Sequence, residues 1–181
     1  MKPWKTLERH TILKHNQFLT VESHTIELPD GRIIQDWPWL VMPDYANILA
    51  ETTDGRFICL RQTKYSIEGE SLAVVGGYLE PGEPPEAAAR RELREETGYE
   101  AARWTRLGGF PIDGNRGAGT AHFYLARGAQ AVAPITADDL EEHQLVFLTQ
   151  EEMRRALLQG EFKLMPWMSI VALGLHYLDS H

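Results

Sequence analysis

The chain has 181 residues, 43% of them apolar and 24% charged, and this composition indicates one globular domain, alone or with a small appendage, rather than a disordered or collagen-like chain. Its 26 acidic residues outnumber the 18 basic ones, and a net charge of −8 argues against binding of nucleic acid through a basic surface. The charge does not argue against a phosphate-bearing ligand, because carboxylates can bind one through divalent cations.

The sequence carries no signal for a membrane or for an oxidising compartment. Residues 1–10 have no apolar run of the kind that a signal peptide needs, and the longest apolar stretch, 164–178, is too short to span a bilayer. Cys59 is the one cysteine and lies in the apolar run 56–60, so we expect a small core residue in a reducing compartment. We therefore predict a soluble, cytoplasmic protein with no membrane partner.

The first third of the chain is predicted to form antiparallel β-structure. Two turns are marked by Pro29-Asp30-Gly31 and Thr53-Asp54-Gly55, in which proline presets a dihedral or glycine accepts a positive φ. The strand-like runs that flank these turns are residues 20–28, 32–35, 46–50 and 57–60. We divide the chain into a small N-terminal β segment, residues 1–45, and a main domain, residues 46–181.

Helices alternate with strands in the main domain. A helix is predicted over 86–97, because Pro84-Pro85 can open it and Gly98 can end it. Thr149 and Glu152 form a capping box, which predicts a second helix through about Leu158. The remaining elements are strands over 104–110, 120–126 and 145–148 and a last helix over about 166–178. Mixed strands flanked by helices predict an α/β layered sandwich, preceded by the small β segment.

Three carboxylates lie together on the first predicted helix. Glu92 and Glu96 are one turn apart on one face, and Glu95 is beside them. Like charges at this spacing, near the helix C-terminus, oppose the helix, so a bound cation would compensate them. Oxygen ligands without His or Cys favour Mg²⁺ or Mn²⁺ over zinc, and a turn at Gly77 would let a backbone carbonyl approach the same ion. The alternative is a solvated charged face with ordinary Arg–Glu pairs.

The segment around these carboxylates resembles the Nudix box, G-x5-E-x7-R-E-U-x-E-E-x-G-U, where U is a bulky apolar residue. The positions are filled in register by Gly77, Glu83, Arg91, Glu92, Leu93, Glu95, Glu96, Gly98 and Tyr99. Further segments look like the ADP-ribose pyrophosphatase branch of that family, namely 4–7, 28–32, 54–56, 60–62 and the closing helices.

The resemblance implies an α/β/α Nudix sandwich with a mixed sheet, and an N-terminal β segment that mediates dimerisation. By the roles of the motif, Glu92 and Glu96 ligate the metal ion, Gly76 supplies a carbonyl, and Glu95 assists. Glu83 and Arg91 brace the loop against the helix, while Gly77 and Gly98 are structural residues of the motif.

Residues outside the box are candidates for substrate binding. Trp37 and Trp39 lie where related dimeric enzymes place an aromatic that stacks on the base, and they could instead be interface core. Arg61, Lys64 and Arg116 could each meet a phosphate, Arg116 from a Gly-rich loop. Lys64 stands where that branch carries a substrate-contacting arginine, so it offers a point charge in place of a bidentate fork.

An acidic loop, residues 138–143, precedes the strand at 145–148. In the resembling branch a glutamate of this loop acts as general base or extra metal ligand. Glu141 matches best by its offset from the strand, and Glu142 is second. The alternative is a solubilising loop.

We therefore predict a Mg²⁺-dependent hydrolase, with Mn²⁺ as the other candidate ion, that cleaves the diphosphate of a nucleoside diphosphate linked to another moiety. An ADP-ribose-like substrate is favoured, and cleavage of ADP-ribose would give AMP and ribose 5-phosphate. The same chemistry on an NDP-sugar, NADH or a dinucleoside polyphosphate is one alternative. A catalytically silent module that senses a nucleotide is the other. The predicted partners are the nucleotide-diphosphate small molecule and a second copy of the chain.

Overall fold

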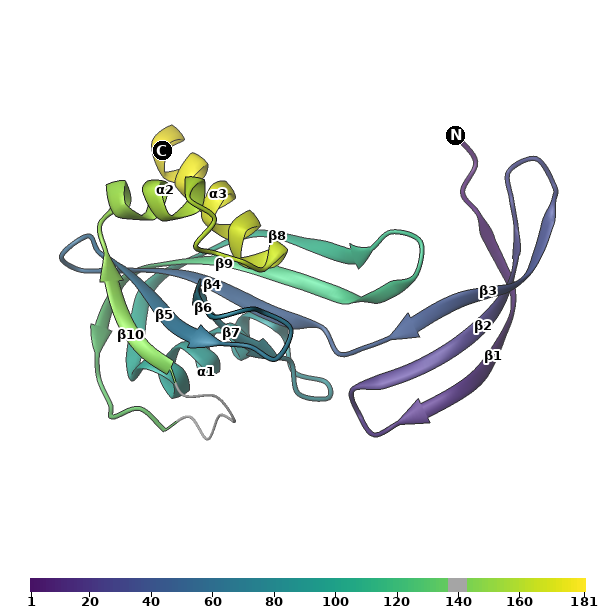
Figure 1. Ribbon diagram of the computed structural model, residues 1–181, viewed down its shortest axis with the longest axis horizontal. Helices are drawn as coiled ribbons and strands as arrows, with labels where there is room; N and C mark the ends of the chain where they lie inside the picture. The colour runs from purple at the N-terminus through teal and green to yellow at the C-terminus, as the bar shows by residue number, and fades with distance from the viewer. Residues whose placement is uncertain (137–142) are drawn as a thin grey trace. The chain divides into compact units, whose positions relative to one another are not determined.

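The computed structural model describes residues 1–136 and 143–181 (Figure 1). The chain divides into two compact units, one formed by residues 1–44 and 110–121 and the other by residues 45–109 and 122–181. The sequence predicts a boundary between the two parts of the chain after residue 45. In the structure the first unit ends at residue 44 and also includes the segment 110–121. This segment contains the tip of a long hairpin, whose first strand starts in the second unit and whose second strand ends there.

The first unit is built on three antiparallel strands, β1 (Lys5–His15), β2 (Leu19–Glu27) and β3 (Ile33–Val41). The turn predicted at 29–31 is confirmed: Gly31 has a φ of 86°, and its N–H donates to the carbonyl of Leu28. Strand β3 also pairs in parallel with the start of β9, where Leu40 lies opposite Gly117, so the sheet is mixed.

The second unit holds the main sheet, in which the strand order is β9-β4-β5-β10, with β7 beside β4, β6 beside β5 and β8 beside β9. Its strands are β4 (Tyr45–Thr52), β5 (Phe57–Thr63), β6 (Glu70–Ala73), β7 (Val75–Tyr78), β8 (Tyr99–Asp113), β9 (Gly117–Ala131) and β10 (His143–Leu148). The predicted strands at 104–110 and 120–126 are confirmed but longer, because they pair with each other as the β8–β9 hairpin.

The three predicted helices are confirmed as α1 (Pro85–Thr97), α2 (Gln150–Leu158) and α3 (Met165–Ser180). Helix α1 ends at Gly98 in the left-handed region, where the glycine N–H donates to the carbonyl of Arg94. Helix α2 begins with the complete capping box of Thr149 and Glu152. Local signals at the helix ends therefore set the helix boundaries.

The helices cover opposite faces of the main sheet (Figure 1). Side chains alternate along β4, so Ala46 and Ile48 pack in one buried cluster with Leu93 of α1. Leu49 points to the other face and reaches Gly174 of α3, where a larger residue would collide with it. These layers are the α/β/α sandwich expected from the sequence.

Two further expectations concern the core and the membrane. Cys59 is fully buried in β5, and burial raises the pKa of its thiol to about 12, so it is an inert core residue. Among the residues that the structure describes, no helix is both long and apolar enough to cross a membrane.

Candidate active site

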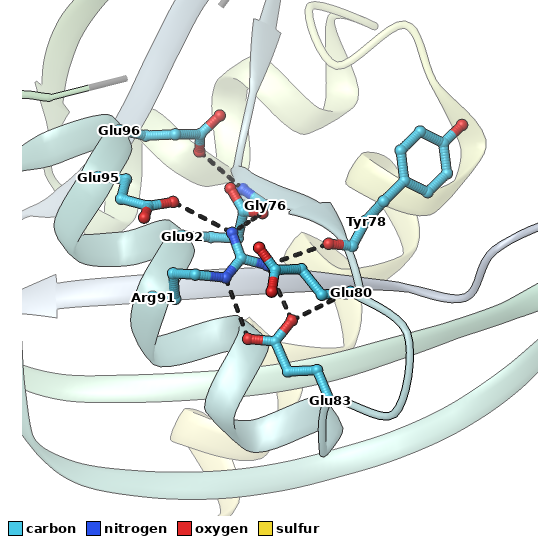
Figure 2. Close-up of polar contacts among 8 residues, drawn as sticks. All are labelled: Gly76, Tyr78, Glu80, Glu83, Arg91, Glu92, Glu95 and Glu96. Atoms are coloured by element: carbon cyan, nitrogen blue, oxygen red, sulfur yellow. Dashed lines mark hydrogen bonds and ion pairs between the residues drawn. The ribbon is translucent and has the colours of Figure 1, made fainter. Parts of the chain in front are cut away.

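The guanidinium of Arg91 lies at the centre of a group of carboxylates on α1 and the loop before it (Figure 2). It makes two parallel hydrogen bonds to Glu83, at 3.0 and 2.9 Å, and it contacts Glu92 at 2.7 Å and Glu95 at 3.1 Å. It also donates to the carbonyl oxygen of Tyr78, at the end of β7, at 3.1 Å. One cation thus ties the loop, the strand end and the helix together.

The pair of Arg91 and Glu83 is partly shielded from water, with 25% and 14% of the two side chains exposed. The hydrogen bonds that Arg91 donates to Glu83 are the largest cause of both pKa shifts: they hold the pKa of Glu83 below its usual value and the pKa of Arg91 above its usual value. Both groups therefore stay charged, which favours the folded loop.

Glu96 turns toward the strand beside the helix. Only 8% of this residue is exposed, and its Oε2 accepts a hydrogen bond of 2.9 Å from the N–H of Gly76 in β7. Strand β7 lies so close to β4 at this point that a side chain at Gly76 would collide with the carbonyl oxygen of Ala46. Glycine is therefore required at position 76 for the contact with Glu96.

Glu92 approaches the next residue of the same strand. A side chain at Gly77 would collide with the carboxylate of Glu92, so the two glycines let both carboxylates reach the backbone of β7. The structure thus brings together Gly76, Gly77, Glu92 and Glu96, with Glu95 one helical position away and held by Arg91.

The donor set suits a hard divalent cation. Within 1–136 and 143–181, no three His, Cys, Asp or Glu side chains gather closely enough to form a metal site on their own. Two carboxylates and the strand backbone do gather, however, and all their donor atoms are oxygens, which Mg²⁺ and Mn²⁺ prefer. The residues present therefore fit such an ion when the backbone is counted among the ligands.

The two predicted stacking residues both line one cavity of about 490 Å³ in the first unit. The indole N–H of Trp37 donates to the carbonyl of Asn115 at 2.7 Å, and Trp39 stacks on the buried ring of His24 with the ring centres 5.3 Å apart. These contacts hold the two rings, and the cavity that they line leaves room for a planar group.

The three residues predicted to bind phosphate do not all belong to the same unit of the structure. Arg61 in β5 forms long ion pairs with Glu70 and Glu161, at 3.9 and 3.6 Å. Lys64 follows β5 directly, and its carbonyl accepts a hydrogen bond from a neighbouring residue of the same loop. Arg116 belongs to the first unit and contacts Asp113 at 3.6 Å. Glu141 and Glu142 lie outside the described residues.

Sequence reasoning missed a cavity of about 260 Å³ in the second unit, which adjoins Gly76 and Gly77. Tyr45, Asn47 and Trp167 line it from β4 and α3. The available signal was the asparagine itself, because Asn47 interrupts the apolar run 46–50 of a strand that is buried on both faces.

Comparisons with known proteins agree with this geometry. The family described as NUDIX domain matches residues 42–168, and the family described as nucleoside diphosphate sugar hydrolase N-terminal domain matches residues 4–40. An ADP-ribose pyrophosphatase of Bacillus subtilis (strain 168) is 29% identical over 157 residues, which cover 84% of this chain and 83% of the relative.

Two further matches extend the comparison. A methanol dehydrogenase activator of Bacillus methanolicus is 27% identical over 153 residues, covering 84% of this chain and 80% of the relative. A crystal structure of an ADP compounds hydrolase has the same fold, with a TM-score of 0.83 over 99% of this chain and 96% of that one, at 21% identity. Nudix hydrolases use divalent metal ions. Because the NUDIX domain spans more than half of the sequence and includes the carboxylates of α1, the chain belongs to the Nudix family and is a Nudix hydrolase.

Proposed function

We propose that this Nudix hydrolase cleaves the diphosphate of a nucleoside diphosphate linked to another moiety, with ADP-ribose as the favoured substrate and Mg²⁺ or Mn²⁺ as the ion. The observation that carries the proposal is the pair Glu92 and Glu96, which flank the Gly76–Gly77 backbone. The names of the Bacillus subtilis relative and of the N-terminal family support this substrate class.

Each box residue has a role in this proposal. Glu92, Glu96 and the carbonyl of Gly76 would hold the cation, and Glu95 would assist. When bound, a divalent cation neutralises charge on the diphosphate and activates water for in-line attack at phosphorus. Arg91 keeps Glu92 and Glu95 oriented, and Glu83 in turn fixes Arg91. Arg61, Lys64 and Arg116 are proposed phosphate contacts, and Trp37 and Trp39 are proposed to stack on the base.

A panel of nucleotides with Mg²⁺ tests the activity and the substrate together. We expect turnover of ADP-ribose to AMP and ribose 5-phosphate, and the panel should include an NDP-sugar, NADH and a dinucleoside polyphosphate. Preference for one of those three would keep the chemistry and change the substrate. Absence of any phosphate-containing product would favour the nucleotide sensor instead.

The proposed dimer rests on the first unit, which exposes many large apolar side chains. Among them are Trp4, Leu7, Ile12, Leu13, Phe18, Ile33 and Val41. We expect light scattering at micromolar concentration to give the mass of a dimer, because such a surface is stabilised by burial against a second copy. Ile12→Glu should shift the mass toward the monomer, whereas Leu158→Glu, at an even more exposed apolar residue in α2, should not. A strict monomer in the unmodified protein would refute the dimer.

The proposed general base is Glu141 of the acidic loop. We expect Glu141→Gln to lower kcat at least tenfold with little change in KM, because proton transfer from the attacking water occurs only on the way to the transition state. Glu142→Gln is the matched control and should do much less. A larger effect of Glu142→Gln would assign the base to that residue, and normal kcat in both variants would move the role to Glu95 or another box carboxylate.

A further inference from the structure

The cavity beside Gly76 lies on the α3 face of β4 and β7, across the strand from the box carboxylates. Tyr45 and Asn47 alternate with Ala46 and Ile48, which face α1, so the two lining side chains point toward α3. In the antiparallel register Tyr45 pairs with Tyr78 and Asn47 with Gly76. Figure 2 shows the ring of Tyr78 pointing away from the carboxylates. Gly76 therefore borders this cavity and also contacts the box carboxylate Glu96.

Asn47 is the unusual residue of this cavity. Its side chain is almost completely buried, with 4% of the residue exposed, and its Oδ1 accepts no hydrogen bond from any residue in the described ranges. A buried amide oxygen without a donor destabilises the folded protein, so such a group needs an explanation. Gly76, which lies opposite Asn47 in the pair of strands β4 and β7, has no side chain that could cover the amide.

Aromatic rings form the other walls. The rings of Tyr45 and Tyr78 meet edge to face with centres 6.3 Å apart, and Trp167 at the start of α3 is 7% exposed. Burial, and then the neighbouring Tyr78, raises the pKa of Tyr45 to about 12, so its hydroxyl remains a neutral hydrogen-bond donor. Flat apolar walls with a few fixed polar groups suit a planar ring.

The size and charge of the cavity limit its occupant. No residue that lines it is charged, so a phosphate group would lose its hydration without gaining a cation. Its volume of about 260 Å³ is below the roughly 300–1,000 Å³ of sites that take whole drug-sized ligands, which indicates one ring system. The amide of Asn47 offers a donor and an acceptor side by side, which matches the edge of a nitrogen heterocycle better than a sugar rich in hydroxyls.

We propose that this cavity is a subsite for an uncharged nitrogen heterocycle of the substrate, whose hydrogen-bonding edge pairs with the amide of Asn47. The inference rests on the proposed function, because the ring must belong to a molecule whose diphosphate is cut beside Gly76. Two sources share this chemistry: a ring on the far side of the diphosphate, as in NADH, or the base of the nucleoside diphosphate, which would then bind here in place of the stacking on Trp37 and Trp39 proposed above.

The test compares the unmodified protein with Asn47→Leu and with Gln130→Leu, which removes an exposed amide of β9 as the matched control. Binding of adenosine and of reduced nicotinamide riboside is measured by calorimetry, and kcat/KM is measured for ADP-ribose and NADH. We expect Asn47→Leu to weaken binding of one nucleoside about tenfold, with an unchanged or higher Tm, because the unpaired buried amide is gone. Gln130→Leu should change neither nucleoside binding nor kcat/KM.

The kcat/KM values identify the ring. An equal loss for both substrates in Asn47→Leu assigns the cavity to adenine, and a loss for NADH alone assigns it to the nicotinamide ring. Asn47→Ala, which adds no volume, is expected to give the same pattern if the leucine variant folds poorly. The proposal is overturned if neither nucleoside binds the unmodified protein, or if binding survives both substitutions. An unmodified protein that binds a nucleoside but hydrolyses neither ADP-ribose nor NADH would count against the proposed function and leave the subsite standing.

Discussion

Glu96→Gln should lower kcat by roughly a hundredfold or more at saturating Mg²⁺, a loss of about 2.7 kcal/mol in transition-state stabilisation. The substitution removes the charge of a proposed metal ligand. A glutamine at this position can still accept the hydrogen bond from the Gly76 N–H, so β7 should stay in place and Tm should change little. Initial rates of ADP-ribose hydrolysis and a thermal melt measure the two effects.

Glu86→Gln is the matched control for this substitution. Glu86 lies on the same helix, but its exposed side chain pairs with Arg90 at 2.8 Å, so we expect normal activity. Near-normal turnover in Glu96→Gln at saturating Mg²⁺ would contradict the assignment of Glu96 as a metal ligand. A large drop in Tm together with the loss of activity would instead assign Glu96 mainly to holding β7.

Glu83→Gln should destabilise the protein by about 1–2 kcal/mol at neutral pH, because two charge-assisted hydrogen bonds with Arg91 are weakened in a partly buried place. The folded-state pKa of Glu83 is lowered from 4.5, so the charged form favours the folded state. Its contribution is therefore complete above the unfolded pKa and is lost as the pH falls through the lowered folded pKa.

The measurement is the difference in Tm between the unmodified protein and Glu83→Gln over a series of pH values. We expect a full difference at neutral pH that shrinks toward zero in acid. Glu86→Gln serves again as control, and its exposed pair should contribute only a few tenths of a kcal/mol. A Tm difference that stays constant or grows in acid would show that the charge of Glu83 is not what stabilises the loop.

Helix α1 illustrates how much the sequence determined. Its start at Pro85, its end at Gly98 and the common face of Glu92 and Glu96 all follow from spacing and end signals within about fifteen residues. The capping box of α2 and the turn at Gly31 were readable for the same reason. The full spacing of the box also identified the Nudix family, since each of its positions has a local mechanical role.

The cavity at Asn47 shows what local signals could not reveal. The apolar run around Asn47 predicted a strand, but only the register of β4 against β7 places the asparagine opposite Gly76. Only the packing of α3 then adds Trp167, 120 positions further along the chain, to the same cavity. Neither the register of β4 against β7 nor the packing of α3 produces a periodic pattern in the sequence.

The sequence by itself thus determined the three helices, most of the strands, the acidic face of α1 and the family, because hydrogen bonds and side-chain periodicity within one element act over a few residues. It did not predict strands β1, β6 and β7. The tertiary structure alone decided that Glu96 reaches the N–H of Gly76, that the expected contact of Glu83 with Arg91 is bidentate, and that the segment 110–121 belongs with residues 1–44. These contacts depend on strand register and on which layers pack together, and both are set by burial of the whole core rather than by any short run of residues.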